Sequence, residues 1–329
     1  MPRTLVATLL AVLVVTGTVS AATLLNVSYD PTREFYTEFN AHFAAYLKRK
    51  TGQDVEIQQS HGSSGAQARA VIQGLDADVV TLALAADIDA IAAQTKSLPA
   101  DWAKRLPDNS TPYTSTIAFL VRKGNPKHIH DWDDVAKPGV GVITPNPKTS
   151  GAARWNFLAA YSYGLKRNHN DDAKARALVA AIYKNALVLD TASRASTITF
   201  TDRGLGDVLL SWENEAILAQ REHPGQYDLI VPSVSILAEP PVTWIDANVA
   251  KHGTEAVAKA YLEYLYTEDG QRLACKWGYR PRMLSVYGSC GTKFARSDLT
   301  TIANFGGWDV AQKRFFADGG VFDQIYGVK

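Results

Sequence analysis

The sequence predicts an α/β protein made of two units that are joined by two crossing strands. Three observations lead to this prediction. Strand-like and helix-like segments alternate between residues 24 and 84, and the same rhythm restarts after Val140. Loops rich in proline and polar residues, at 106–112 and 238–246, separate these stretches from the rest of the chain. Such alternation is typical of parallel α/β sheets, and we expect C-terminal sequence to complete the first unit.

The first unit is expected to contain three strands with helices between them. Short apolar runs bounded by turn residues predict strands at 24–30, 54–60 and 77–84. After the first strand, apolar side chains recur near helical spacing at Phe35, Phe39, Phe43 and Leu47. Gly52 is placed to end that helix, and a second helix is expected from 66 to 75.

The second unit is expected to repeat this pattern. A strand at 113–124 leads into it, and further strands are predicted at 139–144, 186–190 and 206–212. Helices are expected to begin at Ser150 and near Ser193, directly after two of these strands. One continuous helix is expected at 254–274, after the second break in the chain.

Composition places the chain among globular proteins and gives no sign of nucleic-acid binding. Of its 329 residues, 46% are hydrophobic and 20% are charged, and the net charge is +1. No run of basic residues is longer than the Lys-Arg-Lys at 48–50, which is typical of a solvated helix end. A nucleic-acid partner is therefore not expected, because it would call for a basic surface.

The N-terminus has the pattern of a secretory signal peptide. Arg3 is followed by an apolar run at 5–15 and then by small residues that end at Ala21. The apolar run is short for a membrane span, and the small residues resemble a signal-peptidase site. We expect residues 1–21 to be removed and the mature chain to be exported without a lipid anchor, since no cysteine follows the small residues.

Cys275 and Cys290 are the only cysteines. In an oxidising compartment they could close a loop as a disulfide, and the alternative is two unpaired buried thiols. A metal site built on them is not expected, because no pair of histidines lies nearby in the sequence.

Polar and small residues follow four of the predicted strands, at 28–32, 60–65, 148–154 and 191–196. The first turn of a helix has unpaired main-chain N–H groups with partial positive charge, so a helix that begins at any of these four segments could bind an anion there. Taken singly, each also reads as ordinary helix capping. One anion held between the two units would explain all four together, and the indole of Trp212 would add a donor at the end of another strand.

A site made only of hydrogen-bond donors selects a fully ionised tetrahedral dianion. Protonated phosphate carries an O–H group that needs an acceptor, and leaving that group unpaired in a dry site costs about 1–3 kcal/mol. Sulfate carries no such proton near neutral pH. The residue pattern therefore favours sulfate over phosphate.

These motifs resemble the periplasmic sulfate-binding proteins, which deliver sulfate, and in some members thiosulfate, to an ABC permease. The resemblance covers nearly all of the mature chain and is most specific in SYDPTRE (28–34) and NPKTSGAAR (146–154). It implies the two-lobe periplasmic-binding-protein fold of type II, with two crossing hinge strands. It places 22–112 and 241–329 in lobe 1 and 113–240 in lobe 2, and it leaves open on which lobe the tail after about residue 270 packs.

The resemblance also implies the function and its partners. A periplasmic, monomeric binding protein is expected, with sulfate or thiosulfate and a membrane ABC permease as partners. No catalysis, cofactor or metal ion is implied.

The resemblance implies a set of site residues. Main-chain N–H groups of five residues, the Ser150 hydroxyl and the Trp212 indole would bind sulfate; the five are Asp30, Ser64, Gly151, Ala152 and Ser193. The Asp30 carboxylate repels a dianion, so we expect it to point away and to cap the helix that follows. Arg154, Arg194 and His61 are expected to support the binding segments without touching sulfate.

Two other functions fit parts of the pattern. Ala152 and Ser193 stand where the family often has Gly and Ala, so the alternative to sulfate is a site that prefers thiosulfate or another tetrahedral oxyanion such as molybdate. An exported serine hydrolase is the alternative enzyme class. The segment HGSSG (61–65) is similar to a nucleophile elbow, but the pattern G-x-S-x-G would need glycine at Ala66.

Overall fold

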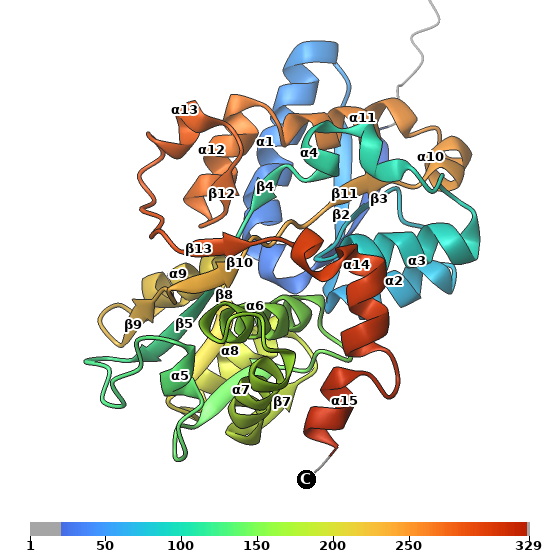
Figure 1. Ribbon diagram of the computed structural model, residues 1–329. Helices are drawn as coiled ribbons and strands as arrows, with labels where there is room; N and C mark the ends of the chain where they lie inside the picture. Colours follow the sequence, from blue (N-terminus) through green and yellow to red (C-terminus); the bar gives the residue numbers. More distant parts are fainter. Residues whose placement is uncertain (1–20, 328–329) are drawn as a thin grey trace, which may run out of the picture.

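The computed structural model describes residues 21–327. The signal peptide expected at 1–21 lies outside the described residues except for Ala21. Two sheets with helices around them form two units, one above the other in Figure 1. Between residues 21 and 327, no helix has both the length and the apolar character that a membrane span requires.

The first unit contains a four-stranded sheet in the order β11-β3-β1-β2. Its strands are β1 (Ala22–Tyr29), β2 (Val55–Gly62), β3 (Val79–Thr81) and β11 (Val242–Trp244). β1 runs parallel to β2 and β3, and β11 pairs antiparallel with β3. The helices between them are α1 (Arg33–Thr51), α2 (Ser64–Ile72) and α3 (Ala85–Thr95). This confirms the strand–helix alternation predicted for 24–84. The sequence did not predict α3, which follows this stretch.

The buried face of α1 and its C-terminal end are as the sequence predicts. Phe35, Phe39 and Phe43 are fully buried, as their helical spacing predicts. Gly52 follows the last turn with a φ of 76°, a left-handed conformation that costs glycine little because it has no Cβ.

The second unit contains a five-stranded sheet in the order β7-β6-β8-β5-β9. Its strands are β5 (Ile117–Arg122), β6 (Val142–Pro145), β7 (Ala186–Asp190), β8 (Val208–Trp212) and β9 (Tyr227–Ile230). Its helices are α6 (Gly151–Arg167), α7 (Asp172–Lys184), α8 (Ser193–Thr201) and α9 (Glu213–Glu222). The predicted helix starts near Ser150 and Ser193 are confirmed. β6 is parallel to β7 and β8, whereas β5 is antiparallel to β8 and β9.

Two crossing strands connect the units, as predicted. β4 (Tyr113–Thr114) leads into β5, and β10 (Val234–Ile236) leads back towards β11. Ser115 and Ala238 lie opposite each other at the crossing and exchange two main-chain hydrogen bonds, both of 2.9 Å. β12 (Arg280–Pro281) pairs with β4, and the buried Arg280 forms a bidentate ion pair with Glu213 (2.6 and 2.8 Å).

The single helix expected at 254–274 is wrong, because the structure has two helices there. They are α11 (Glu255–Tyr264) and α12 (Glu268–Lys276). The Thr267 side chain caps α12 by accepting from the main-chain N–H of Gly270. A Cβ at Gly270 would lie 2.1 Å from the carbonyl oxygen of Tyr264, so only glycine allows the second helix to start this close to the first.

Cys275, in α12, and Cys290 form a disulfide, so the two cysteines are paired rather than free. The disulfide ties α12 to the segment after α13 (Leu284–Tyr287). The remaining short elements before that segment are η1 (Asp30–Thr32), η2 (Trp102–Arg105), α4 (Pro107–Ser110), α5 (Trp132–Val135) and α10 (Asp246–His252).

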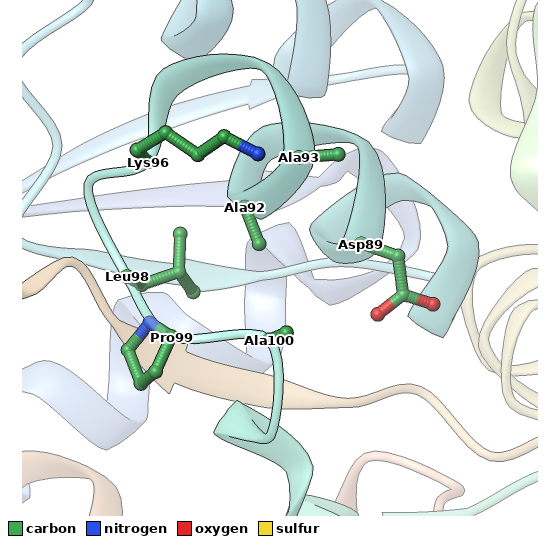
Figure 2. Close-up of a pocket in the computed structure, with 7 residues that line it drawn as sticks. All are labelled: Asp89, Ala92, Ala93, Lys96, Leu98, Pro99 and Ala100. Carbon is green, nitrogen blue, oxygen red and sulfur yellow. The ribbon is translucent and has the colours of Figure 1, made fainter.

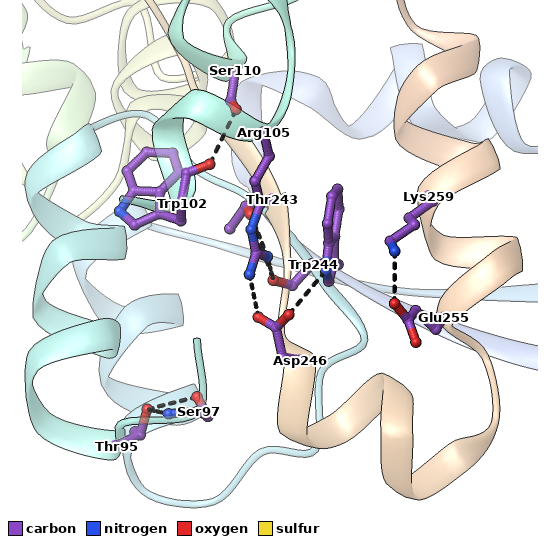
Figure 3. Close-up of polar contacts among 10 residues, drawn as sticks. All are labelled: Thr95, Ser97, Trp102, Arg105, Ser110, Thr243, Trp244, Asp246, Glu255 and Lys259. Carbon is purple, nitrogen blue, oxygen red and sulfur yellow. Dashed lines mark hydrogen bonds and ion pairs between the residues drawn. The ribbon is translucent and has the colours of Figure 1, made fainter. Parts of the chain in front are cut away.

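Polar contacts hold the connection after α3 against β11 and the helix after it (Figure 3). Arg105 donates to the carbonyl of Trp244 (3.0 Å) and pairs with Asp246. Its guanidinium lies 4.3 Å from the centre of the Trp244 ring, and the ammonium of Lys259 lies 5.3 Å from it. These contacts make residues 95–110 and 242–264 parts of one unit.

The C-terminal segment runs from the first unit to the second. β13 (Asp298–Thr300) pairs with β10 and is followed by η3 (Ile302–Phe305), α14 (Gly307–Ala311), η4 (Gln312–Phe316) and α15 (Val321–Tyr326). Phe315, Phe316 and Phe322 pack around Phe157 of α6. The tail therefore packs on helices of the second unit, a placement that the sequence left open. Burial of these aromatic rings against α6 and α7 accounts for it.

Candidate functional site

The start of α6 packs directly on the first unit. A Cβ at Gly151 would lie 3.0 Å from side-chain carbons of Ala83, Leu84 and Ser64. Four residues further on, Trp155 donates from its indole to the carbonyl of Ala83 (2.9 Å). Glycine thus permits a close approach of the start of α6 to the start of α2. We call the place where Gly151 and Trp155 meet Ser64, Ala83 and Leu84 the junction.

At the start of α2, the hydroxyl of Ser64 is already engaged. It donates to Asp87 (2.5 Å) and accepts from the main-chain N–H of Ala83 (3.0 Å). This leaves the Ser64 main-chain N–H, which forms no hydrogen bond within residues 21–327. The hydroxyl contacts a carboxylate and not a histidine, which does not match the arrangement of a serine hydrolase.

At the start of α6, Ser150 is the N-cap and is 2% exposed. Its Oγ accepts from the N–H of Ala153 (3.4 Å), so the hydroxyl proton remains free to be donated. Its own N–H donates to the carbonyl of Asn146 (2.8 Å). In the part of the chain that the structure describes, the N–H groups of Gly151 and Ala152 have no hydrogen-bond acceptor.

Trp212 lies at the end of β8, between the two units. Its indole N–H donates a long hydrogen bond to the carbonyl oxygen of Ala152 in α6 (3.4 Å). Its ring centre is 5.4 Å from that of Tyr29, at the end of β1. The structure therefore places this donor beside the start of α6, where the sequence predicts the anion.

The start of α8 meets η1 of the first unit. The Arg194 N–H donates to the carboxylate of Asp30 (2.9 Å). The expectation that Asp30 caps the helix following it is wrong: it caps α8 of the other unit instead, because that helix start supplies unpaired N–H groups. Burial raises the pKa of the Asp30 carboxyl, and the N–H groups of Arg194 and of Asp30 itself oppose that rise.

Ser193, the first residue of α8, is 6% exposed. Its N–H forms no hydrogen bond within the described range of 21–327. All seven predicted binding residues are buried. Ser64 meets Gly151 and Trp212 meets Ala152 at the junction. Asp30 and Ser193 lie where η1 meets the start of α8.

Both arginines of the predicted set are neutralised by carboxylates. Arg194 pairs with Glu34 and lies 3.8 Å from Glu215. Arg154 donates to the carbonyl of Pro147 (2.9 Å) and lies 3.5 Å from Asp87. Their positive charges are thus matched by carboxylates from the first unit, Glu34 and Asp87.

His61 is also unable to supply a charge at neutral pH. Burial and the neighbouring charge of Arg33 lower its pKa to about 4. Its Nδ1 is buried and has no hydrogen-bond partner within the described chain. The three basic residues of the predicted set, Arg154, Arg194 and His61, therefore bring no unpaired positive charge to the donors at the junction.

Glu215 is a residue near the junction that sequence reasoning missed. It lies in the first turn of α9, is 1% exposed, and accepts from the hydroxyl of Thr197 (3.2 Å). Burial raises its pKa to about 7, and the charges of Asp30 and Glu34 add to the effect of burial, while Arg194 opposes it. The only sequence signal was the pair of glutamates, Glu213 and Glu215, that follows Trp212.

Glu215→Gln is expected to flatten the pH dependence of stability. The folded state of the unaltered protein binds more protons than the unfolded state between the ordinary pKa of glutamate and about 7. Its free energy of unfolding should therefore fall as pH rises through this window, by up to about 3 kcal/mol from this group. Urea unfolding at pH 5 and pH 8 would measure the fall, which Glu215→Gln should remove and an exposed Glu255→Gln control should keep. Equal slopes in both variants would refute this assignment.

Two surface hollows lie away from the junction. One of about 430 Å³ lies beside α3 and is lined by Asp89, Ala92, Ala93, Lys96, Leu98, Pro99 and Ala100 (Figure 2). Another of about 620 Å³ lies near Asp76, Asp78 and His252. Neither contains a residue of the predicted site.

Comparisons with known proteins identify the family of this chain. Residues 25–280 match the family model described as bacterial extracellular solute-binding protein. The chain is 59% identical over 304 residues to the sulfate-binding protein of Escherichia coli K12, covering 92% of each chain. It is 48% identical over 309 residues to the thiosulfate-binding protein of Pseudomonas aeruginosa, covering 93% of each.

A solved structure is similar along almost its whole length. The sulfate-binding protein SubI from Mycobacterium tuberculosis H37Rv superposes with a TM-score of 0.80 at 30% identity, covering 90% of this chain and 99% of that one. The chain therefore belongs to the family of bacterial extracellular solute-binding proteins that includes these sulfate- and thiosulfate-binding proteins.

Proposed function

We propose that this protein binds sulfate at the junction through neutral hydrogen-bond donors. The observation that carries this proposal is the set of unpaired N–H groups at the starts of α2, α6 and α8. The α2 and α6 starts meet at the junction beside the Ser150 hydroxyl and the Trp212 indole, and the Thr149 hydroxyl ties the turn before α6 to Thr191, just before α8. Under this proposal, the donors are the N–H groups of Asp30, Ser64, Gly151, Ala152 and Ser193 together with those two side chains.

Neutral donors can hold a dianion because partial charges from several helix starts act on it at short range. Arg154 and Arg194 would support the site by holding main chain and carboxylates in place, and His61 would support its loop. A site of this kind offers no acceptor for a ligand proton, so it should reject protonated phosphate.

We propose that the two units are the lobes of a binding protein that closes over its ligand. Lobe 1 would comprise 22–112 and the part of 241–329 before the C-terminal segment, and lobe 2 would comprise 113–240 with that segment packed on it. The crossing at Ser115 and Ala238 would be the hinge. The protein would act as a periplasmic monomer without a cofactor, after removal of 1–21, and its closed form would deliver sulfate to a membrane ABC permease.

Calorimetric titration of the ligand-stripped mature protein in chloride buffer tests the proposal. Sulfate, thiosulfate, molybdate and phosphate would be titrated separately. Tight one-to-one binding of sulfate with negligible binding of phosphate is the expected result. Tighter binding of thiosulfate or molybdate than of sulfate would instead mean that Ala152 and Ser193 set a different preference at the same site. No binding of any of the four anions would refute an oxyanion-binding function.

A further inference from the structure

The turn before α6 carries the Ser150 hydroxyl and the Gly151 and Ala152 N–H groups to the junction. Its inner side is fixed by hydrogen bonds from Asn146 N–H to the carbonyl of Asp190 (2.8 Å) and from the Thr149 hydroxyl to the carbonyl of Thr191 (2.9 Å). Its outer side is held by Lys148, the one cation of the turn.

Lys148 points to the C-terminal segment and not to the other donors. Its ammonium donates to the carboxylates of Asp323 (2.9 Å) and Asp318 (3.0 Å) and to the carbonyl of Phe316 (3.2 Å). Phe316 ends η4, Asp318 lies in the turn after it, and Asp323 belongs to α15. The ammonium therefore has three acceptors, all of them in the C-terminal segment.

The same segment contacts the first unit as well. Trp308 of α14 packs edge-on against Trp155, with ring centres 4.6 Å apart. Trp155 in turn donates to Ala83 of the first unit, and α14 itself lies against α3. In Figure 1 the segment runs in red from the level of α2 and α3 down to α15 beside the second unit. The segment therefore contacts the second unit through Trp155 and Lys148 and the first unit through α3.

We propose that residues 307–326 form a strap that positions the anion-binding turn, with Lys148 as the positioning residue. This inference rests on the proposed function, because it concerns affinity at that site. The strap holds the turn from outside through Lys148 and α6 through Trp155, so the Ser150, Gly151 and Ala152 donors are fixed before the anion arrives. Fixing donors in advance lowers the cost of ordering them on binding.

A different role for Lys148, direct attraction of its charge to sulfate, predicts the opposite change in sulfate affinity. If its ammonium acted on sulfate by charge attraction, removing its carboxylate partners would expose that charge and tighten binding. If it positions the turn, removing the partners loosens the turn and weakens binding. The double variant Asp318→Asn/Asp323→Asn separates the two roles, because it leaves Lys148 in place.

The experiment measures sulfate affinity by calorimetry and dissociation by stopped-flow fluorescence, well below the unfolding temperature. Asp318→Asn/Asp323→Asn and Lys148→Met should each weaken binding about threefold to fivefold through faster dissociation. The triple variant should be no weaker than either, since all three changes remove one interaction. Lys148→Arg should retain most of the affinity, and Lys313→Met, which breaks the exposed pair with Asp309 on the same segment, should leave it unchanged.

Tighter binding by the double asparagine variant, or wild-type affinity in Lys148→Met, would overturn the proposal. A loss of thermal stability with unchanged sulfate affinity would assign Lys148 a purely structural role and would also overturn it. Failure of the proposed function is distinguishable from these results, because the unaltered protein would then bind no sulfate.

Discussion

Gly151→Val is expected to weaken sulfate binding about 100-fold, by overpacking the junction. Even the first carbon of the new side chain would lie 3.0 Å from carbons of Ala83, Leu84 and Ser64, and the two methyl groups would reach further. The start of α6 could then not approach the start of α2, and donors from the two lobes could not meet one anion. Calorimetric titration with sulfate would measure the loss, and Gly151→Ala should give an intermediate affinity.

The stability of the free protein separates this effect from misfolding. Valine loses less backbone entropy than glycine in a helix, and the clash disappears if the lobes open. Without sulfate, the free energy of unfolding of Gly151→Val should therefore stay within about 1 kcal/mol of the unaltered protein. Sulfate should raise the melting temperature of the unaltered protein and hardly affect that of the variant. Wild-type affinity in Gly151→Val would show that this close approach is not needed for binding.

Much of this arrangement could be predicted because its signals are local. The strands around 24–30, 54–60 and 186–190, the end of α1 at Gly52 and the helix starts at Ser150 and Ser193 depend on residues within one or two turns of each other. Parallel strands bring their carboxyl ends to one edge, so the helix starts that follow them could be grouped from sequence alone.

The features that sequence reasoning missed depend on distant residues. Asp30 caps a helix 164 positions away, and Lys148 meets Asp323 across 175 positions. The spacing of apolar residues along the sequence gives no information about partners this far apart. The break between α11 and α12 depends on how closely Gly270 approaches Tyr264, and helical spacing alone could not show it. The burial that raises the pKa of Glu215 likewise exists only after α8 and α9 have packed.

Trp212→Phe is expected to weaken sulfate binding by about 1.5–3 kcal/mol, the range for a hydrogen bond to a charged group. Phenylalanine keeps an aromatic ring against Tyr29 but removes the indole N–H, which donates to the carbonyl of Ala152 in the first turn of α6 (3.4 Å). The dianion would lose one donor in a buried place where no water can replace it, since Trp212 is 1% exposed. Calorimetry should show an affinity about 10- to 150-fold lower.

Trp132→Phe is the matched control, because this tryptophan is also buried in the second unit and donates from its indole to a main-chain carbonyl, that of Val234 (2.8 Å). Both variants lose an indole donor and some packing, so both should lower the free energy of unfolding. Only Trp212→Phe should lower sulfate affinity, since only Trp212 lies beside the donors of α6. Equal sulfate affinities in the two variants would remove the indole from the set of donors and leave the anion to the main-chain N–H groups and Ser150 alone.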